Sequence, residues 1–397
     1  MHAADAQALE RLFEACPAWT GITSAKDAVG LDGRTLLHSG PPAEAGHVIP
    51  TLNSAAVACV FEGWAANLEE ADQLVASGGV TLAPAQEMNV ATPLAAVVSP
   101  SMQVLVMEDL AGQGKRAAAP LNGGGTGGAP AARYGRKSPE ALDLLRFLHE
   151  TVAPAIAPAA ADEPVPWLSI VDEALTKGDD AHLRHLEANN TLSAILAERL
   201  KPGFVESEAG RFAAEWPIFH LNFWMAAARC ALSAAIGVSG SGLVTHCGGN
   251  GMTFGMQVSG LPGRWFTAPA AVPQGNVREP LTLDDCTGAY GDSALAEGFG
   301  LGAMALSYCP DMKALHEGFY EESAFALPEK LLMGWHPGFP ASDALAGLSA
   351  RAVVETGETP LVELGLVEKS GEGGGLGAGL YRPPVQPFAN AVEALQS

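Results

Sequence analysis

Residues 246–297 constrain the fold more than any other stretch of this chain, because glycine-rich turns flank a clear strand pattern there. Every second residue from 252 to 258 is apolar, as in a strand with one buried face. A turn at 261–263 then predicts a hairpin whose returning strand begins at Arg264. Glycine lets backbone N–H groups approach a ligand closely, and successive N–H groups can bind an anion. The run therefore also predicts a ligand site.

Two polar positions of this run stand out. Arg264 is one of only 22 Lys and Arg residues, and its apolar neighbours predict partial burial, where a lone guanidinium needs an anionic partner. A surface strand pair with Trp265 is the alternative. Asp292 and Ser293 precede an apolar helix, so a helix cap is predicted there, and the start of a capped helix can also bind an anion.

Charge and composition exclude several classes of protein. The formal net charge of −22 argues against nucleic acid and against an anionic membrane as partners, but it leaves room for a small anionic substrate. The six cysteines form no C-x-x-C pair, which argues against a zinc ribbon. No signal peptide is visible, and the most apolar helix, about 216–236, contains His220, Asn222 and Arg229, as a buried core helix does. We therefore expect a cytoplasmic protein.

The order of predicted elements indicates an α+β fold, with two mixed α/β portions and a helical segment between them. The portions are 1–137, 138–237 and 238–397, and the last is glycine-rich and carries the candidate site. Ser138, with a proline and an acid after it, predicts the start of a helix. Further predicted helices span 6–16 and 67–76, and predicted strands span 34–38, 80–83 and 103–108.

Two motifs resemble binding motifs but lack the context that these need. Gly123–Gly128 satisfies G-x-G-x-x-G, yet no good strand precedes it and no helix begins at its last glycine, so a loop is expected. His182 and His185 share a predicted helix face near Glu187. Without a third ligand at matching spacing, an exposed helix surface is favoured over a metal site.

Three polar residues elsewhere allow a structural and a functional interpretation. His38 ends an apolar strand before a glycine turn, where an interior histidine and one that faces a cleft are equally compatible with the pattern. Glu355 and Thr356 fit either the end of a helix or the wall of a polar pocket.

The chain contains no serine elbow, no H-E-x-x-H and no Cys/His nucleophile pattern, so covalent catalysis by a protein nucleophile is not predicted.

Co-linear strings over most of the chain resemble the YlbE/AllG family, which is found as one subunit of bacterial oxamate carbamoyltransferase. They include Thr35-Leu36-Leu37-His38, Phe61-Glu62-Gly63-Trp64, Leu121-Asn122, Arg133-Tyr134-Gly135, Gly178-Asp179 with His182 and Arg184, Asn250-Gly251, Arg264-Trp265-Phe266-Thr267-Ala268-Pro269, Pro273-Gln274-Gly275, Gly291-Asp292-Ser293 and Val353-Val354-Glu355-Thr356-Gly357. The chain departs from the family pattern in the loop after Asn122, which is longer, and after Arg184, where it carries an insertion. Either departure can alter the choice of substrate.

The resemblance implies an enzyme of purine and allantoin nitrogen catabolism that interconverts oxalurate plus phosphate with oxamate plus carbamoyl phosphate. It implies a heteromeric complex with a succinyl-CoA-synthetase-like, FdrA-type subunit and a further subunit, and an α+β fold. We expect no cofactor and no metal. Two alternatives remain: a non-catalytic scaffold subunit of such an assembly, and an amidohydrolase that acts on ureido compounds.

Carbamoyl transfer passes through a tetrahedral oxyanion, so the site must stabilise negative charge and orient two anions. On this hypothesis Arg264 and Asp292 are catalytic, and Glu62 or Glu297 handles the amide proton. The candidate substrate-binding residues are Gly249, Asn250, Gly251, Thr267, Gln274, Gly275, Ser293, His38, Asn122, Glu355 and Thr356. The hypothesis requires the hairpin near Trp265 and the turn before Ser293 to converge in space.

Overall fold

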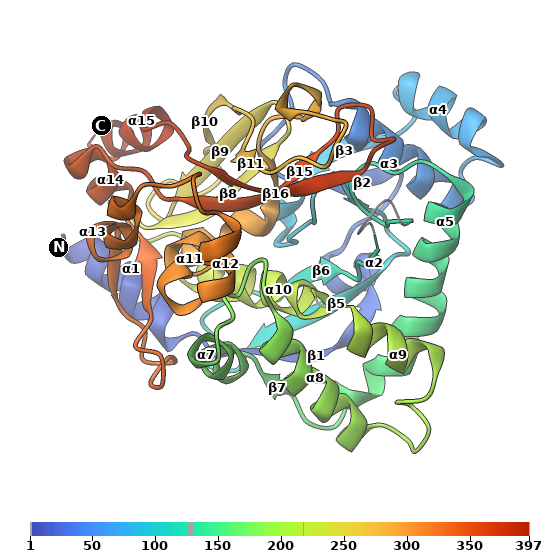
Figure 1. The fold of residues 1–397 in the computed structure, drawn as a ribbon, viewed down its shortest axis with the longest axis horizontal. Coiled ribbons are helices and arrows are strands. Elements are labelled where there is room, and N and C mark those ends of the chain that lie inside the picture. Colours follow the sequence, from blue (N-terminus) through green and yellow to red (C-terminus); the bar gives the residue numbers. More distant parts are fainter. Residues whose placement is uncertain (1, 125–129, 217, 397) are drawn as a thin grey trace.

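The computed structural model describes residues 2–124, 130–216 and 218–396, and it shows a mixed α+β protein with several small sheets (Figure 1). The predicted fold class is therefore confirmed. Most of the Gly123–Gly128 loop lies outside the described residues. No helix of the part that the structure describes is long and apolar enough to cross a membrane.

The first sheet is antiparallel and has the strand order β6-β5-β1-β7. Its strands are β1 (Pro17–Ser24), β5 (Gln103–Asp109), β6 (Ala117–Pro120) and β7 (Val165–Pro166). A smaller sheet has the order β3-β2-β4. Its strands are β2 (Thr35–His38), β3 (Thr81–Pro84) and β4 (Val97–Val98). The strands predicted at 34–38, 80–83 and 103–108 are thus present, with ends that differ from the prediction by one residue.

The second large sheet has the order β10-β9-β8-β12. Its strands are β8 (Val244–Asn250), β9 (Thr253–Val258), β10 (Phe266–Pro269) and β12 (Tyr290–Gly291). The hairpin predicted from the 252–258 alternation is confirmed as β9 and β10. Because β10 and β12 occupy opposite edges of this sheet, the hairpin and the turn before Ser293 do not converge.

Two more groups of strands complete the C-terminal part. β11 (Gln274–Gly275), β16 (Gly375–Tyr381) and β15 (Val362–Val367) form a sheet in that order. β13 (Leu332–Trp335) pairs with β14 (Leu345–Leu348). Figure 1 shows β15 and β16 running across the molecule above the short helices of this part.

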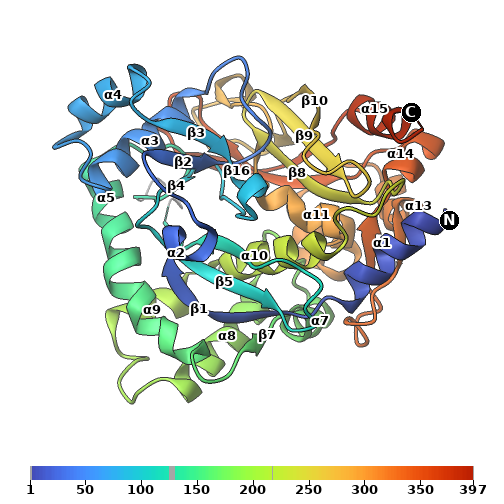
Figure 2. The ribbon, with the colours of Figure 1, turned by 180° about the vertical axis from the view of Figure 1, so that it is seen from behind.

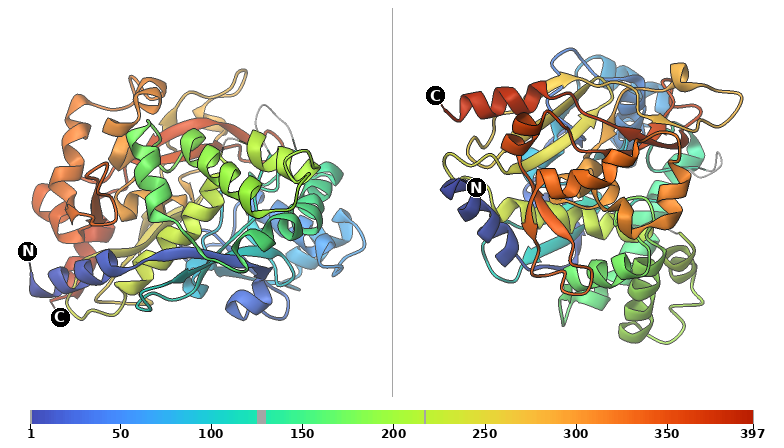
Figure 3. Two further views of the ribbon diagram at one scale, coloured as in Figure 1. Left: turned by 90° about the horizontal axis from the view of Figure 1, so that it is seen from below. Right: turned by 60° about the vertical axis from the view of Figure 1, so that its left-hand side comes forward.

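Helices surround the sheets. They are α1 (Ala3–Glu14), α2 (Ala25–Val29), α3 (Ile49–Phe61), α4 (Leu68–Ala76), α5 (Pro139–Arg146), α6 (Ala153–Ile156), α7 (Leu168–Thr176), α8 (Leu186–Arg199), α9 (Glu208–Glu215), α10 (Phe219–Ala234), α11 (Leu295–Phe299), α12 (Pro310–Leu315), α13 (Leu327–Leu331), α14 (Ala350–Thr356) and α15 (Gln386–Ala394). Ser138 caps α5 by accepting the amide of Ala141, as predicted. Both ends of the chain lie on one side of the molecule (Figures 2 and 3), where Asp5 forms an ion pair of 3.2 Å with Arg351.

Helix α10 lies at the centre of the core, where it contacts β1, β5 and β6 of the first sheet and β8 of the second (Figure 1). All of its residues are buried, as expected for a helix that is apolar on every side. Arg229 is accommodated because its guanidinium donates to the Asn89 side chain at 2.8 Å and to the Thr245 carbonyl at 2.6 Å. One core cluster runs from Ala8 to Ala391 and includes residues of all three predicted portions. The domain boundaries at 137 and 237 stay a prediction.

Candidate functional site

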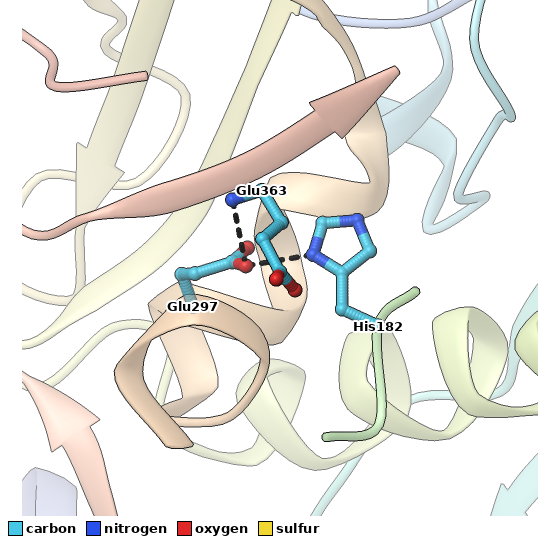
Figure 4. Close-up of side chains that lie close together, drawn as sticks. All are labelled: His182, Glu297 and Glu363. Carbon is cyan, nitrogen blue, oxygen red and sulfur yellow. Dashed lines mark hydrogen bonds and ion pairs between the residues drawn. The ribbon is translucent and has the colours of Figure 1, made fainter. Parts of the chain in front are cut away.

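A buried cluster of ionisable side chains lies between α11, β15 and the loop that follows α7. Glu297 comes from α11, Glu363 from β15 and His182 from the loop, and Figure 4 shows the three side chains pointing toward one another. Nδ1 of His182 lies 2.7 Å from Oε1 of Glu297. Nε2 of His316, just after α12, lies 3.0 Å from Oε1 of Glu363. Asp180 is the fifth member, and no member is more than 1% exposed.

Backbone hydrogen bonds hold this cluster in place. Oδ1 of Asp180 accepts the amides of the three residues from His182 to Arg184, so the loop forms a tight buried turn instead of a helix. Oε1 of Glu297 accepts the amides of Ala303 at 3.0 Å and Glu363 at 3.1 Å. These bonds fix the carboxylate of Glu297 against both the following turn and β15.

The charges of the cluster shift one another's pKa values. Burial raises the pKa of Glu363 to about 7, with the charge of Glu297 as a further cause, and burial also raises the pKa of Glu297. Burial and the neighbouring charge of Glu363 raise the pKa of Asp180. Burial lowers the pKa of His182, but the charge and hydrogen bond of Glu297 outweigh it, and the pKa rises to about 9. Perturbed pKa values of this kind gather at functional sites.

Gly302 closes the cluster on one side. It adopts a φ of +61°, and a Cβ atom there would lie 2.1 Å from Oε1 of Glu297.

We expect Gly302→Ala to lower the free energy of unfolding by about 2 kcal/mol, measured by urea denaturation, because the backbone strain and the steric overlap add. Gly357→Ala is the matched control, since its φ is +69° but nothing lies within 4 Å of a Cβ atom. Equal losses in the two variants would contradict the tight packing at Glu297.

A cavity of about 360 Å³ is lined by several close chain neighbours of the cluster residues, although by none of the five cluster residues themselves. Its lining includes Tyr134, Leu183, Ile218, Arg278, Met312, Leu315, Gly365 and the backbone of residues 375–378. Leu183 follows His182 in the chain, Leu315 precedes His316, and Gly365 follows Glu363 by two residues on the same face of β15. The ionisable cluster is therefore next to the wall of a cavity large enough for small anions.

Arg133 brings a positive charge to the same region. It is 4% exposed, and its guanidinium lies 4.4 Å from the ring centre of Tyr134, which lines the cavity, and 5.8 Å from that of Trp216. Among the residues that the structure describes, no carboxylate pairs with Arg133, and its Nε has no hydrogen-bond partner. Burial lowers the pKa of Arg133, yet a guanidinium stays charged at neutral pH. A buried guanidinium that has no carboxylate partner among the described residues is a favourable place for an anion.

Tyr134, whose ring contacts Arg133, has an uncommon backbone conformation. Its φ of +63° is rare for a residue other than glycine. The conformation places the ring against Gly375, where a Cβ atom would come within 2.9 Å of the ring. Such conformations are often retained where function requires them.

A second cavity, of about 420 Å³, is lined by Gln86, Asn89, Lys115, His246 and Gln257, among others. Its buried polar side chains already have partners: Gln86 donates to Asp292, the His246 ring contacts the Thr245 hydroxyl, and Gln257 accepts the Gly263 amide. The cavity lined by Tyr134 is the better candidate, because Arg133, which contacts Tyr134, is buried without a carboxylate partner among the described residues.

The prediction that Arg264 is partly buried is wrong. The turn continues through Arg264, the strand begins only at Phe266, and the exposed guanidinium lies 4.9 Å from the ring centre of Phe266. Arg264 and the exposed Thr267 line an open hollow together with Asn390 and Glu393 of α15. Neither residue lies near the turn before Ser293, because that turn follows the opposite edge of the sheet.

The glycine-rich run serves close packing between backbones. Asp292 does not cap α11; its carboxylate accepts the amides of Gly40 at 2.8 Å and Thr92 at 2.9 Å. A Cβ atom on Gly40 would lie 2.4 Å from the Gly249 backbone. Asn250 accepts two amides of the β8–β9 turn. The other predicted glycines, Gly251 and Gly275, also press against neighbouring atoms.

The remaining predicted residues lie in several places. Glu62 accepts from Ser101, whereas Gln274 is exposed and bonds the Val272 carbonyl. Ser293 is buried with an unpaired hydroxyl. His38 is buried against His47, and burial lowers its pKa to about 4. Asn122 is buried, and its side-chain oxygen lacks a hydrogen-bond partner among the described residues. Glu355 and Thr356 are exposed at the end of α14, which agrees with the interpretation of these residues as a helix end.

Of the predicted catalytic residues, the structure places only Glu297 in the ionisable cluster. The predicted exposure of His182 and His185 is wrong, because both are 1% exposed in the turn that Asp180 organises. Asp179 accepts the Ala188 amide in the first turn of α8. Glu363 was missed. Its signal was a single carboxylate in an otherwise uncharged strand.

Comparisons with known proteins show the family of this chain. The family model for oxamate carbamoyltransferase subunit AllG matches residues 80–293. The oxamate carbamoyltransferase subunit AllG of Escherichia coli K12 is 30% identical, with 99% of this chain and 97% of AllG covered. The uncharacterized protein YahG of the same organism is also 30% identical, with 98% and 85% covered. A crystal structure of a conserved protein of unknown function from Enterococcus faecalis V583 aligns with a TM-score of 0.90 at 28% identity, with 99% and 97% covered. The chain belongs to the AllG family.

Proposed function

We propose that this chain is a subunit of an oxamate carbamoyltransferase-like enzyme, which interconverts oxalurate plus phosphate with oxamate plus carbamoyl phosphate. The observation that carries the proposal is the similarity to E. coli AllG over 99% of the chain. The cavity beside Arg133 supports it, because both reactants are small anions and the protein has a net charge of −22. Such a protein needs a local positive charge to bind them.

The proposed reaction makes and breaks one bond each at the carbamoyl carbon. A phosphate oxygen attacks that carbon, the bond to the oxamate nitrogen breaks, and the nitrogen takes up one proton. Negative charge develops on the carbamoyl oxygen in the transition state, and a fixed guanidinium stabilises such charge most effectively where water is excluded. We assign this role to Arg133, whose guanidinium has no carboxylate partner in the part of the chain that the structure describes. The assignment replaces Arg264, which is exposed.

We also propose partner subunits and a metabolic pathway for this chain. We infer that the chain works in a cytoplasmic complex with a synthetase-like, FdrA-type subunit and a further subunit, in purine and allantoin nitrogen catabolism. The cavity is partly open at Arg278, which is exposed and donates to the Gly373 carbonyl. A partner subunit could complete the site there.

An assay of the purified chain, alone and mixed with the proteins of neighbouring genes, tests the proposal. Oxalurate and phosphate are supplied, and carbamoyl phosphate is measured. We expect product in the complete mixture and little or none without this chain. A mixture that forms product equally well without the chain would contradict the proposal. Ureido-compound hydrolysis by the chain alone, without a need for phosphate, would support the amidohydrolase alternative instead.

A further inference from the structure

We propose that His182, Glu297 and Glu363 bind one divalent transition-metal cation, with Zn²⁺ or Mn²⁺ as the fitting ions. One ligand atom from each of these residues lies within 4.8 Å of the other two. The ligands come from the loop after α7, from α11 and from β15, as Figure 4 shows. The proposal does not depend on the reaction, and it stands or falls separately from the carbamoyltransferase assignment.

The unsatisfied oxygens of the cluster give independent support. Among the described residues, Oε2 of Glu297 and Oε2 of Glu363 have no hydrogen-bond partner, and Oε1 of Glu363 has only the ion-pair contact with His316, although the two glutamates are 1% and 0% exposed. Buried polar atoms are nearly always satisfied in native proteins. The nearby amides of Ala303 and Glu363 already bond Oε1 of Glu297. Oxygens that receive no donor in a buried site are the natural ligands of a cation.

The numbers of acidic and basic groups in the cluster also favour a bound cation. Three carboxyl groups, those of Asp180, Glu297 and Glu363, are buried near two imidazoles, those of His182 and His316. Isolated buried carboxylates are strongly unfavourable unless they pair with a cation or bind a metal. Oδ2 of Asp180 also lacks a hydrogen-bond partner among the described residues, so a third buried carboxyl group lies beside the site. A divalent cation would neutralise the excess.

The ligand types favour a transition metal over Ca²⁺ or Mg²⁺. An imidazole nitrogen suits Zn²⁺, and carboxylates suit Mn²⁺ and are also accepted by Zn²⁺. Three protein ligands leave a further coordination position open, as in catalytic zinc sites. His316, 3.0 Å from Oε1 of Glu363, is placed to orient that carboxylate.

Metal analysis of the full chain tests the inference. The protein is purified without a histidine tag, incubated with Zn²⁺ or Mn²⁺, dialysed, and analysed by mass spectrometry of the elements. We expect about one ion per chain, and less than about a tenth of that in Glu363→Gln and in Glu297→Gln, since each variant loses a ligand. Glu355→Gln is the matched control, because it makes the same chemical change at an exposed helix end, and it should keep the ion.

Two further measurements keep the test decisive if a variant folds poorly. The wild-type protein should melt several degrees higher with Zn²⁺ or Mn²⁺ than after treatment with a chelator, because an ion that binds only the folded state stabilises it. Anomalous scattering from a crystal grown with Zn²⁺ should place the ion between His182, Glu297 and Glu363. A wild-type protein that holds no ion after loading, or an ion located elsewhere, would overturn the inference and show that protons neutralise the cluster.

Discussion

Arg133→Gln should slow carbamoyl phosphate formation by the assembled enzyme about 10²- to 10³-fold, the usual loss when one preorganised charge-stabilising donor is removed. The wild-type guanidinium is buried against Tyr134 and Trp216, where water does not screen its charge. The measurement is the initial rate with saturating oxalurate and phosphate. The free energy of unfolding should fall by no more than about 2 kcal/mol, because only the ring contacts are lost and no carboxylate among the described residues loses a partner.

Two variants serve as controls for Arg133. Arg264→Gln should leave the rate within about twofold, because an exposed guanidinium that stacks on Phe266 contributes little. Arg133→Lys keeps a charge but loses the planar stack, so it should recover part of the activity. If Arg133→Gln keeps full activity while Arg264→Gln loses it, the cavity beside Tyr134 is not the anion site.

Asp292→Ala should lower the free energy of unfolding by about 3–5 kcal/mol, since it leaves buried donors without an acceptor. The carboxylate, 0% exposed, accepts from Gly40 at 2.8 Å, Gln86 at 2.6 Å and Thr92 at 2.9 Å. Burial raises the pKa of Asp292 to about 7, against the effect of these donors. Urea denaturation followed by circular dichroism measures the loss.

The control for Asp292 is Asp143→Ala, which removes a carboxylate that is 74% exposed and should change the free energy of unfolding by less than about 0.5 kcal/mol. Asp292→Asn retains one acceptor oxygen and should lie between the alanine variant and the wild type. A catalytic role would show a different result: a stable Asp292→Ala protein whose turnover has fallen a hundredfold or more, roughly as for loss of a key catalytic contact.

Local patterns predicted the elements of this fold well. The alternation at 252–258 marked β9, and the Ser138 cap marked α5. These signals depend on near neighbours in the chain, which set strand periodicity and helix starts. The edge position of β10 could not be predicted, because strand order depends on contacts between distant segments. Because of this strand order, Arg264 does not lie near Asp292, and the two do not form one site.

The candidate site was less predictable for the same reason. His182, Glu297 and Glu363 are separated by 115 and 66 positions, and no spacing rule connects them. A histidine pair three residues apart resembled an exposed helix face, but the carboxylate of Asp180 turns this segment inward by binding successive amides. The sequence pattern of this segment is typical of a helix, but the hydrogen bonds to the buried Asp180 carboxylate hold it in a turn instead.

The contact between Asp292 and Gly40 has a consequence for how the protein is made. The two residues are 252 positions apart, so at about 5–20 residues per second the ribosome needs on the order of 13–50 seconds to deliver one after the other. During that interval β2 can pair with β3 and β4, but the amide of Gly40 lacks its carboxylate acceptor. Chaperones have access to the segment around Gly40 for that time, and a fragment that stops before β12 never acquires its native surroundings.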